Sequence, residues 1–135
     1  RLVGSEMCIR DSEKNNKVSI HAHQSQDERR KQIITDVDVL RTAGPFALCK
    51  IGLVTGRTHQ IRAQFAACGH PLLGDGKYGK GDVNRRYHET RQALYSYKLR
   101  FDFPTDAGLL NYLKGQEFTV ENVPFREKYF PEIPS

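Results

Sequence analysis

One stretch of the chain gathers side chains that could bind an anion or hold a carboxylate in place. It reads TGRTHQIR over residues 55–62. Guanidinium, imidazole and amide groups at the start of a helix, where backbone N–H groups lack partners within the helix, favour a phosphate or carboxylate ligand. His59 and Arg62 are three residues apart, so on a helix they project from neighbouring positions of one surface. The candidate functional residues are therefore Arg57, His59, Gln60 and Arg62.

This stretch lies where a strand is expected to end and a helix to begin. Residues 46–54 are mostly apolar and predict a strand. Apolar or weakly polar residues then recur at helical spacing and predict the buried stripe of a helix over residues 58–68. They are Ile61, Phe65 and Cys68. Thr58 is the expected N-cap of this helix, and Gly69 lies where it should stop.

The rest of the chain predicts short elements. Residues 33–40 read as a strand with Thr35, Val37 and Val39 on one face, joined by a turn over residues 41–45 to the next strand as an antiparallel hairpin. Further on we expect a loop with a helical turn over residues 79–90, an amphipathic strand over 92–103, a short helix over 109–113, a short strand over 117–123 and a docking turn over 124–130. The expected fold class is α+β, with a mixed, largely antiparallel sheet flanked by helices.

The amino-terminal residues give little indication of structure. Residues 1–12 show no sustained periodicity and are set aside as a non-native or disordered segment. Residues 13–31 are polar, and only Val18 and Ile20 suggest a short strand. We therefore expect ordered structure to begin near Gln32.

Positive charge is concentrated in the middle of the sequence. The whole chain carries +5, whereas residues 50–100 contain ten Lys and Arg against three acids, a net charge of +7. A basic balance of this kind is typical of proteins that bind nucleic acid. Arg85, Arg86 and Arg91 predict a patch that contacts phosphates, with a merely solvated face as the alternative.

The cysteines and the hydropathy exclude several classes of protein. Three cysteines without a CxxC spacing indicate neither a disulfide framework nor a zinc knuckle, and they favour a reducing cytoplasm. No ligand spacing for zinc is found among Cys49, Cys68, His59 and His70. The apolar runs are too short to cross a bilayer. We expect a cytoplasmic, monomeric protein with no metal and no membrane association.

Two motifs together resemble a known family. TGRTHQIR at residues 55–62 is followed by GHPLLGDGKYG at residues 69–79. In order and spacing they resemble the late motif of the pseudouridine synthases of the RluA/RsuA type, and the resemblance extends over residues 32–103. It implies an enzyme that isomerises uridine to pseudouridine in ribosomal or transfer RNA without a cofactor.

The resemblance assigns Arg62 as the partner of the catalytic aspartate of that family. A nearby guanidinium keeps a secluded carboxylate ionised by lowering its pKa, typically by about 1–3 units. Arg62→Ala is then expected to abolish isomerisation while leaving the fold and most RNA affinity intact. Asp75, Lys77 and Tyr78 are expected to shape the loop behind the site, with contact to the substrate as the alternative. The expected RNA-binding residues are Arg57, His59, Gln60, Lys77, Arg85, Arg86 and Arg91.

Some of these residues have simpler interpretations. Arg62 could instead form a surface salt bridge, and the residues around it could cap a helix or fix a loop. Aromatic residues could stack on bases, but aromatic residues of strands more often belong to a core. They are Tyr87, Tyr95 and Tyr97.

The sequence departs from the family at the residue that does the chemistry. The catalytic aspartate of the family lies upstream in an Arg-Leu-Asp motif, which these 135 residues do not contain. The upstream active-site tyrosine has no match either. Residues 13–135 are therefore expected to be the C-terminal portion of a pseudouridine synthase catalytic domain, inactive alone. The alternatives are a non-catalytic RNA-binding module and a helix-turn-helix protein that reads DNA with residues 58–68; the flanking strands argue against the second.

Overall fold

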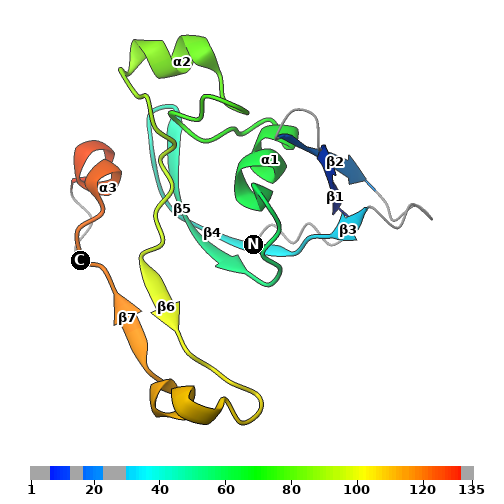
Figure 1. The fold of residues 1–135 in the computed structure, drawn as a ribbon. Coiled ribbons are helices and arrows are strands. Elements are labelled where there is room, and N and C mark those ends of the chain that lie inside the picture. Colours follow the sequence, from blue (N-terminus) through cyan, green and yellow to red (C-terminus); the bar gives the residue numbers. More distant parts are fainter. Residues whose placement is uncertain (1–6, 13–16, 23–29, 132–135) are drawn as a thin grey trace. The chain divides into compact units, whose positions relative to one another are not determined.

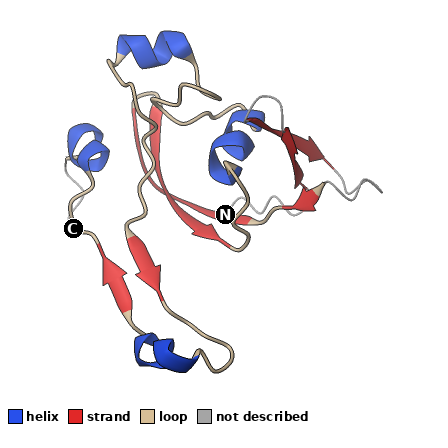
Figure 2. Ribbon diagram, viewed as in Figure 1, coloured by secondary structure: helices blue, strands red, loops and turns tan. Residues whose placement is uncertain are grey.

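The structure is a computed structural model that describes residues 7–12, 17–22 and 30–131. The chain divides into two compact units, residues 1–93 and residues 94–135. Each unit is built of short helices and strands (Figures 1 and 2). In the described part of the chain, no helix is both long enough and apolar enough to span a membrane.

The first unit opens with a small antiparallel sheet. Its strands β1 (Met7–Ser12), β2 (Lys17–Ala22) and β3 (Lys31–Gln32) lie in the order β2-β1-β3. The strand suggested by Val18 and Ile20 is therefore confirmed, but the expectation that ordered structure begins near Gln32 was wrong. A ladder satisfies backbone N–H and C=O groups whatever the side-chain periodicity, so a segment without an alternating pattern can still form a strand.

A long hairpin follows, as the sequence predicts. Strands β4 (Thr35–Ala43) and β5 (Phe46–Leu53) pair antiparallel. The turn is tighter than expected, because β4 continues to Ala43 and Gly44 reverses the chain with φ of 56°. The pairing shifts between Val39 and Arg41, so that Leu40 is an extra residue on β4.

The hairpin buries a different face at each end. Thr35 and Val37 are buried, and they pair with odd-numbered residues of β5. Leu48 is buried too, but it is even-numbered and therefore faces the other side of the sheet. Val39 was expected to share the buried face of Thr35, yet its side chain is 56% exposed. The burial of this face of β4 therefore ends at Val37, before the bulge is reached.

Helix α1 spans Gln60–Ala67 and differs from the expected helix in two respects. It begins after His59, which takes the N-cap position with φ of 52°, so Thr58 is not the N-cap. Its buried residues are Gln60, Ala63 and Gln64, whereas Cys68 is exposed. The prediction of an apolar buried stripe was therefore wrong. The buried face is largely polar because two glutamine side chains find hydrogen-bond partners on the hairpin.

A short helix and a ring contact complete the first unit. Helix α2 (Gly81–Arg86) supplies the helical turn predicted within residues 79–90. The Tyr87 ring that follows it meets the Phe46 ring edge to face, with centroids 4.7 Å apart. This contact lies on the same even-numbered face of β5 as Leu48.

The second unit is a small hairpin with two helical turns. Strands β6 (Lys98–Arg100) and β7 (Glu117–Thr119) pair antiparallel on either side of the 3-10 helix η1 (Gly108–Leu113), and helix α3 (Pro124–Tyr129) follows. The predicted short helix is confirmed. The predicted strand over residues 92–103 is formed only where β7, itself three residues long, provides a partner.

The α+β class is confirmed, but the single mixed sheet is not. Within the described residues the strands form three separate sheets, and every strand pair in them is antiparallel. No sheet exceeds three strands, so helices do not flank a common sheet as expected.

Candidate functional site

The loop that leads into α1 is fixed by one buried amide. Gln60 is 3% exposed, and its Oε1 accepts hydrogen bonds from the Thr55 hydroxyl at 2.9 Å and from the Arg57 backbone N–H at 3.0 Å. Its Nε2 donates to Thr35 Oγ1 at 2.8 Å and to the Ile34 carbonyl at 3.2 Å. These four bonds use both donors and both acceptor positions of the amide. The RNA contact predicted for Gln60 would break at least one of them, so the geometry favours a structural role.

A second glutamine ties the next turn of α1 to the hairpin. The Thr35 hydroxyl donates to Gln64 Oε1 at 2.6 Å while it accepts the hydrogen bond from Gln60. Both glutamines and Thr35 are buried. The start of the helix is thus held against β4 by a connected polar network, which restricts the positions that the side chains of its first turn can take.

Arg62 is paired within the chain. Its Nε donates to Asp75 Oδ2 at 2.8 Å and its Nη2 donates to Asp75 Oδ1 at 2.9 Å, a bidentate ion pair. The Arg62 side chain is 16% exposed and the Asp75 side chain 0%. Arg62 therefore does not point into solvent, and the surface salt bridge considered above is excluded by the burial of Asp75.

Asp75 is kept ionised although it is buried. Burial by itself raises the pKa of a carboxyl, but the hydrogen bond from Arg62 and those from the backbone N–H groups of Lys77 and Tyr78 outweigh it and lower the pKa of Asp75 to about 2. The same contact with Asp75 raises the pKa of Arg62. Both partners carry full charge at neutral pH.

The loop that carries Asp75 is closed by tight backbone packing. The Asn84 side chain of α2 accepts a hydrogen bond from Gly74 N at 2.7 Å and donates one to the Asp75 carbonyl at 3.1 Å. A Cβ built on Gly74, whose φ is 78°, would lie 1.9 Å from the Arg91 carbonyl oxygen, and one built on Gly79 would lie 2.2 Å from the Asp75 carbonyl oxygen. Only glycine fits at these two positions, which supports the prediction that this motif shapes a loop.

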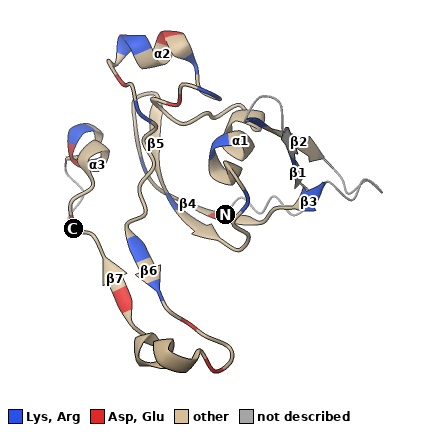
Figure 3. Cartoon of the chain, in the orientation of Figure 1, with Lys and Arg blue, Asp and Glu red and all other residues tan. Residues whose placement is uncertain are grey.

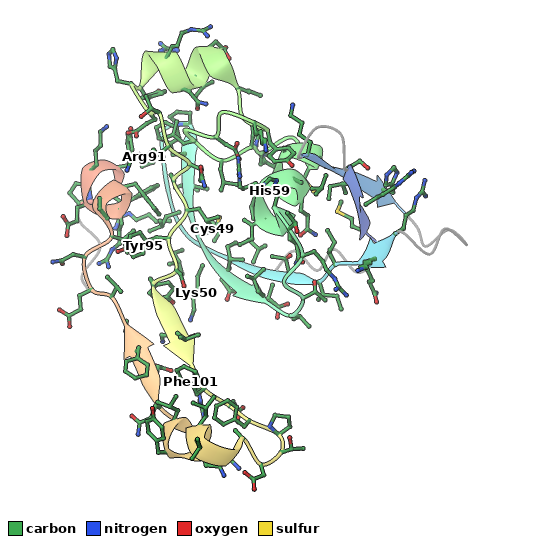
Figure 4. All side chains as sticks on the ribbon, in the orientation of Figure 1. Cys49, Lys50, His59, Arg91, Tyr95 and Phe101 are labelled. Atoms are coloured by element: carbon green, nitrogen blue, oxygen red, sulfur yellow. The ribbon has the colours of Figure 1, made fainter. Side chains whose placement is uncertain are left out.

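Tyr78 contacts both His59 and Arg62, the two residues that helical spacing predicted to lie on one surface. Its hydroxyl lies 2.9 Å from His59 Nδ1 and accepts a hydrogen bond from Val18 N, also at 2.9 Å. The Arg62 guanidinium carbon stands 5.3 Å from the centre of the Tyr78 ring. His59 lies at the start of α1 (Figure 4). One tyrosine therefore contacts the side chains of both candidate residues.

The basic residues expected to bind RNA are mostly on the surface. Arg57, Arg85, Arg86 and Arg91 are exposed, and Lys77 is half-buried. Arg85 and Arg86 lie on α2, which also carries Asp82 (Figure 3). The close approach of Arg91 to Gly74 brings the backbone of this arginine to the loop that holds Asp75.

The remaining sequence candidates separate into packing and surface positions. Tyr87 packs on Phe46, Tyr95 is exposed and Tyr97 is half-buried. Cys49 and Cys68 are free thiols. Among the described residues, no three His, Cys, Asp or Glu side chains are grouped so that they could hold a metal ion.

Comparison with known proteins relates the chain to one family. Residues 5–67, which include the loop and α1 with Arg62, match the family of RNA pseudouridylate synthases. The relatives found carry the same activity in their names. Over just under half of its length the chain is therefore similar to the RNA pseudouridylate synthases.

Three relatives show how far the similarity reaches. The chain is 38% identical over 95 residues to an "uncharacterized RNA pseudouridine synthase" of Chlorobaculum parvum, covering 61% of this chain and 29% of that protein. It is 38% identical to the ribosomal large subunit pseudouridine synthase C of Haemophilus influenzae over 48% of this chain and 21% of the relative. It is also 38% identical to the ribosomal large subunit pseudouridine synthase D of Neisseria meningitidis, over 55% of this chain and 22% of that relative. The chain thus spans less than a third of each of these pseudouridine synthases. No solved structure matches it significantly.

Two features of this site were not anticipated from the sequence. Asp75 was expected only to shape a loop, but it also forms the ion pair with Arg62, and the part of Asn84 in closing that loop was missed. The spacing gave one usable signal, because an acid lies in a glycine-rich turn shortly after a helix that carries an arginine. Nothing in the residue type of Asn84 distinguishes it from a surface asparagine.

The ion pair also corrects the effect expected of Arg62→Ala. We expected this change to leave the fold intact, but it would leave Asp75 buried without its counter-ion. Removing one partner of a buried ion pair costs about 3–5 kcal/mol. Loss of activity in this variant would therefore be confounded by loss of stability, and a milder substitution is needed to test the role of Arg62.

Proposed function

We propose that this chain provides part of the active site of an RNA pseudouridine synthase that isomerises uridine in ribosomal or transfer RNA. The observation that carries the proposal is the match of residues 5–67 to the RNA pseudouridylate synthases, together with relatives named for that activity. The bidentate, largely buried Arg62 supports it, because a positioned guanidinium is what a catalytic carboxylate needs as a partner.

In this reaction the bond between N1 of uracil and C1′ of the ribose breaks, the base rotates, and a bond from C5 to C1′ forms. An aspartate of the complete protein assists at the sugar or the base, and Arg62 stabilises its ionised form. No Arg-Leu-Asp motif occurs in these 135 residues, so this aspartate belongs to polypeptide outside them. The target base must leave the stack to reach the site, which costs about a few kcal/mol.

The exposed basic residues are proposed to hold the RNA backbone. Arg57, Arg85, Arg86 and Arg91 are exposed in a segment of net charge +7, and phosphate contacts of this kind position a nucleic acid without reading its sequence. His59 and Lys77 are proposed as further contacts near the target nucleotide. Gln60 is instead proposed to position the loop through its buried amide.

The complete protein is further proposed to be monomeric and cytoplasmic and to need no cofactor. The free Cys49 and Cys68 support a reducing compartment. Size-exclusion chromatography of the complete protein, and metal analysis after purification, test the first and third of these statements directly.

The test is an isomerisation assay on the complete protein with ribosomal and transfer RNA. Arg62→Lys keeps the positive charge but cannot form a bidentate pair, so it should lose most of the activity and retain RNA affinity. Arg100→Lys, in an exposed position of β6, is the matched control and should behave as the wild type. The role of Arg62 is refuted if its lysine variant turns over at the wild-type rate, and the proposed function fails if the wild-type protein forms no pseudouridine.

A non-catalytic RNA-binding module is the second candidate, and the missing Arg-Leu-Asp motif favours it. Sequence upstream of residue 1 distinguishes the two. An Arg-Leu-Asp motif there, together with pseudouridine formation, identifies the enzyme, whereas RNA binding without isomerisation by the complete protein identifies the module. Comparing structured RNA with duplex DNA at the same salt concentration also tests the DNA-binding alternative.

A further inference from the structure

The guanidinium of Arg62 is engaged along one edge. Its Nε and one hydrogen of Nη2 are used by Asp75. An arginine side chain has five N–H donors in a planar fork, so the second hydrogen of Nη2 and both hydrogens of Nη1 remain. Among the described residues, Asp75 is the hydrogen-bond partner of Arg62, and Tyr78 contacts its face. The end of the fork formed by Nη1 and Nη2 can therefore bind a second carboxylate.

We propose that Asp75 is a positioning residue, which clamps the side of the Arg62 fork so that its Nη1–Nη2 end is presented to the catalytic carboxylate. This inference rests on the function proposed above. It adds a residue that acts through Arg62 and does not itself touch the substrate. It also means that one guanidinium serves two carboxylates, one structural and one catalytic.

Asp75 can act as a clamp because its own position is fixed. Its carboxylate is buried and accepts hydrogen bonds from the backbone N–H groups of Lys77 and Tyr78 at 2.9 and 3.1 Å. Its carbonyl is held by the Asn84 side chain, and Gly79 packs directly against it. The orientation of the fork is therefore set by backbone geometry and not by a mobile surface side chain.

A second contact restricts the plane of the guanidinium. The Tyr78 ring lies 5.3 Å from its central carbon, and the hydroxyl of the same tyrosine is held by Val18 N and paired with His59. The fork is thus held at one edge by Asp75 and on one face by Tyr78. The remaining direction of approach is toward the Nη1–Nη2 end.

Charge and position make opposite predictions for the loss of Asp75. If Asp75 only competed for the charge of Arg62, its removal would leave that charge to the catalytic carboxylate and the rate would be kept or increased. If Asp75 positions the fork, its removal releases the guanidinium, and misplacement of a catalytic group by about 1 Å can lower the rate on the order of 100-fold. The sign of the change in kcat therefore separates the two roles.

The kinetic test uses Asp75→Asn and Asp75→Glu in the complete protein. Asparagine keeps an oxygen for the backbone N–H groups but loses the charge, and glutamate keeps the charge but moves it. Both should lower kcat on the order of 100-fold with KM for RNA little changed, because only the transition state needs the aligned fork. Glu117→Gln is the matched control, since Glu117 is an acid paired with Lys98 at 3.4 Å in a half-exposed ion pair. It should retain wild-type kcat.

A spectroscopic test uses the 135-residue chain itself. In a nitrogen-edited NMR spectrum, a clamped Arg62 gives an Nε–H signal that exchanges slowly with water and separate Nη signals. Asp75→Asn should speed this exchange and merge the Nη signals. Arg57, which is exposed, provides the reference for a freely rotating guanidinium in the same spectrum.

The outcomes separate this inference from the function on which it rests. Absence of pseudouridine formation by the wild-type complete protein defeats the proposed function, while a slowly exchanging Arg62 signal still supports the clamp. Active, folded Asp75 variants with wild-type kcat overturn the positioning role. If neither variant folds, the wild-type spectrum decides, because an Arg62 signal that averages like that of Arg57 overturns the clamp without any substitution.

Discussion

Asp75 is a buried charge whose partners all come from within one short part of the chain. Arg62 and the backbone N–H groups after Asp75 lower its pKa to about 2. A carboxyl with a depressed pKa in the folded state stabilises the fold while it is ionised and loses that contribution when it is protonated. The ion pair of the proposed site is therefore also a source of acid sensitivity.

We expect this contribution to be complete above the ordinary pKa of 3.8, to decrease as the pH falls below that value, and to vanish below about 2. Its size is about 2 kcal/mol, from the difference between the two pKa values. Urea unfolding of the chain between pH 5 and pH 2 measures it. The Asp75→Asn variant is the control and should lack this part of the pH dependence. Parallel pH profiles for the two proteins would contradict the pKa assigned to Asp75.

The glycines of the same loop provide a test of its backbone geometry. Gly74→Ala would place a Cβ 1.9 Å from the Arg91 carbonyl oxygen at a φ of 78°, whereas a Cβ on Gly76 meets no atom within 4 Å. We expect Gly74→Ala to lower the free energy of unfolding by about 1–3 kcal/mol, as overpacking usually does. Gly76→Ala should change it by no more than about 0.5 kcal/mol. Equal unfolding midpoints in urea for the two variants would show that the loop is not packed as described.

At the scale of the elements, the contact between α1 and β4 depends on one hydroxyl. Thr35 Oγ1 both donates to Gln64 and accepts from Gln60, and all three residues are buried. Thr35→Val keeps the shape but leaves the two amides without this partner, which should cost about 1–3 kcal/mol.

The comparison is with Thr42→Val, an exposed position on the same strand. It makes the same chemical change and should leave the stability nearly unaltered. Thermal unfolding followed by circular dichroism compares the two variants. A smaller loss for Thr35→Val than for Thr42→Val would mean that the polar network does not hold the helix.

How far each element could be predicted depended on where its partners lie. The hairpin of β4 and β5 was predictable because the turn and both apolar strands are adjacent in the sequence. The buried face of α1 was not, because Gln60 and Gln64 are buried only by virtue of Thr35, which lies 25 and 29 residues away. Hydrophobic periodicity cannot reveal a buried polar face whose hydrogen-bond partner is a hydroxyl far away in the sequence.

The candidate site shows the same division. Helical spacing predicted that the His59 and Arg62 side chains lie close to each other, and both contact Tyr78. The pairing of Arg62 with Asp75 did not follow, because it requires the loop between them to fold back, and that depends on the Asn84 bridge and the close packing at Gly74.

At the scale of the whole molecule, the basic segment sets how binding should respond to salt. Each neutralised phosphate releases counterions, so the logarithm of the RNA association constant should fall linearly with the logarithm of salt concentration. Replacing Arg85 and Arg86 together by alanine should make that slope shallower by about 1 for each phosphate that the variant no longer binds. Fluorescence anisotropy with a structured RNA at several salt concentrations measures it.

Lys114→Ala is the control for this prediction, because Lys114 is exposed and lies outside the basic segment. It should leave the slope unchanged. If the double arginine variant also leaves the slope unchanged, the patch is a solvated face and does not contact RNA.

The extra residue in β4 has a consequence for variation in chain length. Because β5 alternates without interruption, Leu48 faces away from Thr35 and Val37 whether or not Leu40 is present, and Leu40 is only an unpaired insertion in β4. Deletion of Leu40 would leave the pairs on both sides of it in place and remove only the local bend of the strand. Natural variants of this protein should therefore tolerate loss of Leu40 far better than loss of a residue between Leu48 and Ile51 of β5, which would turn one of the two buried ends outward.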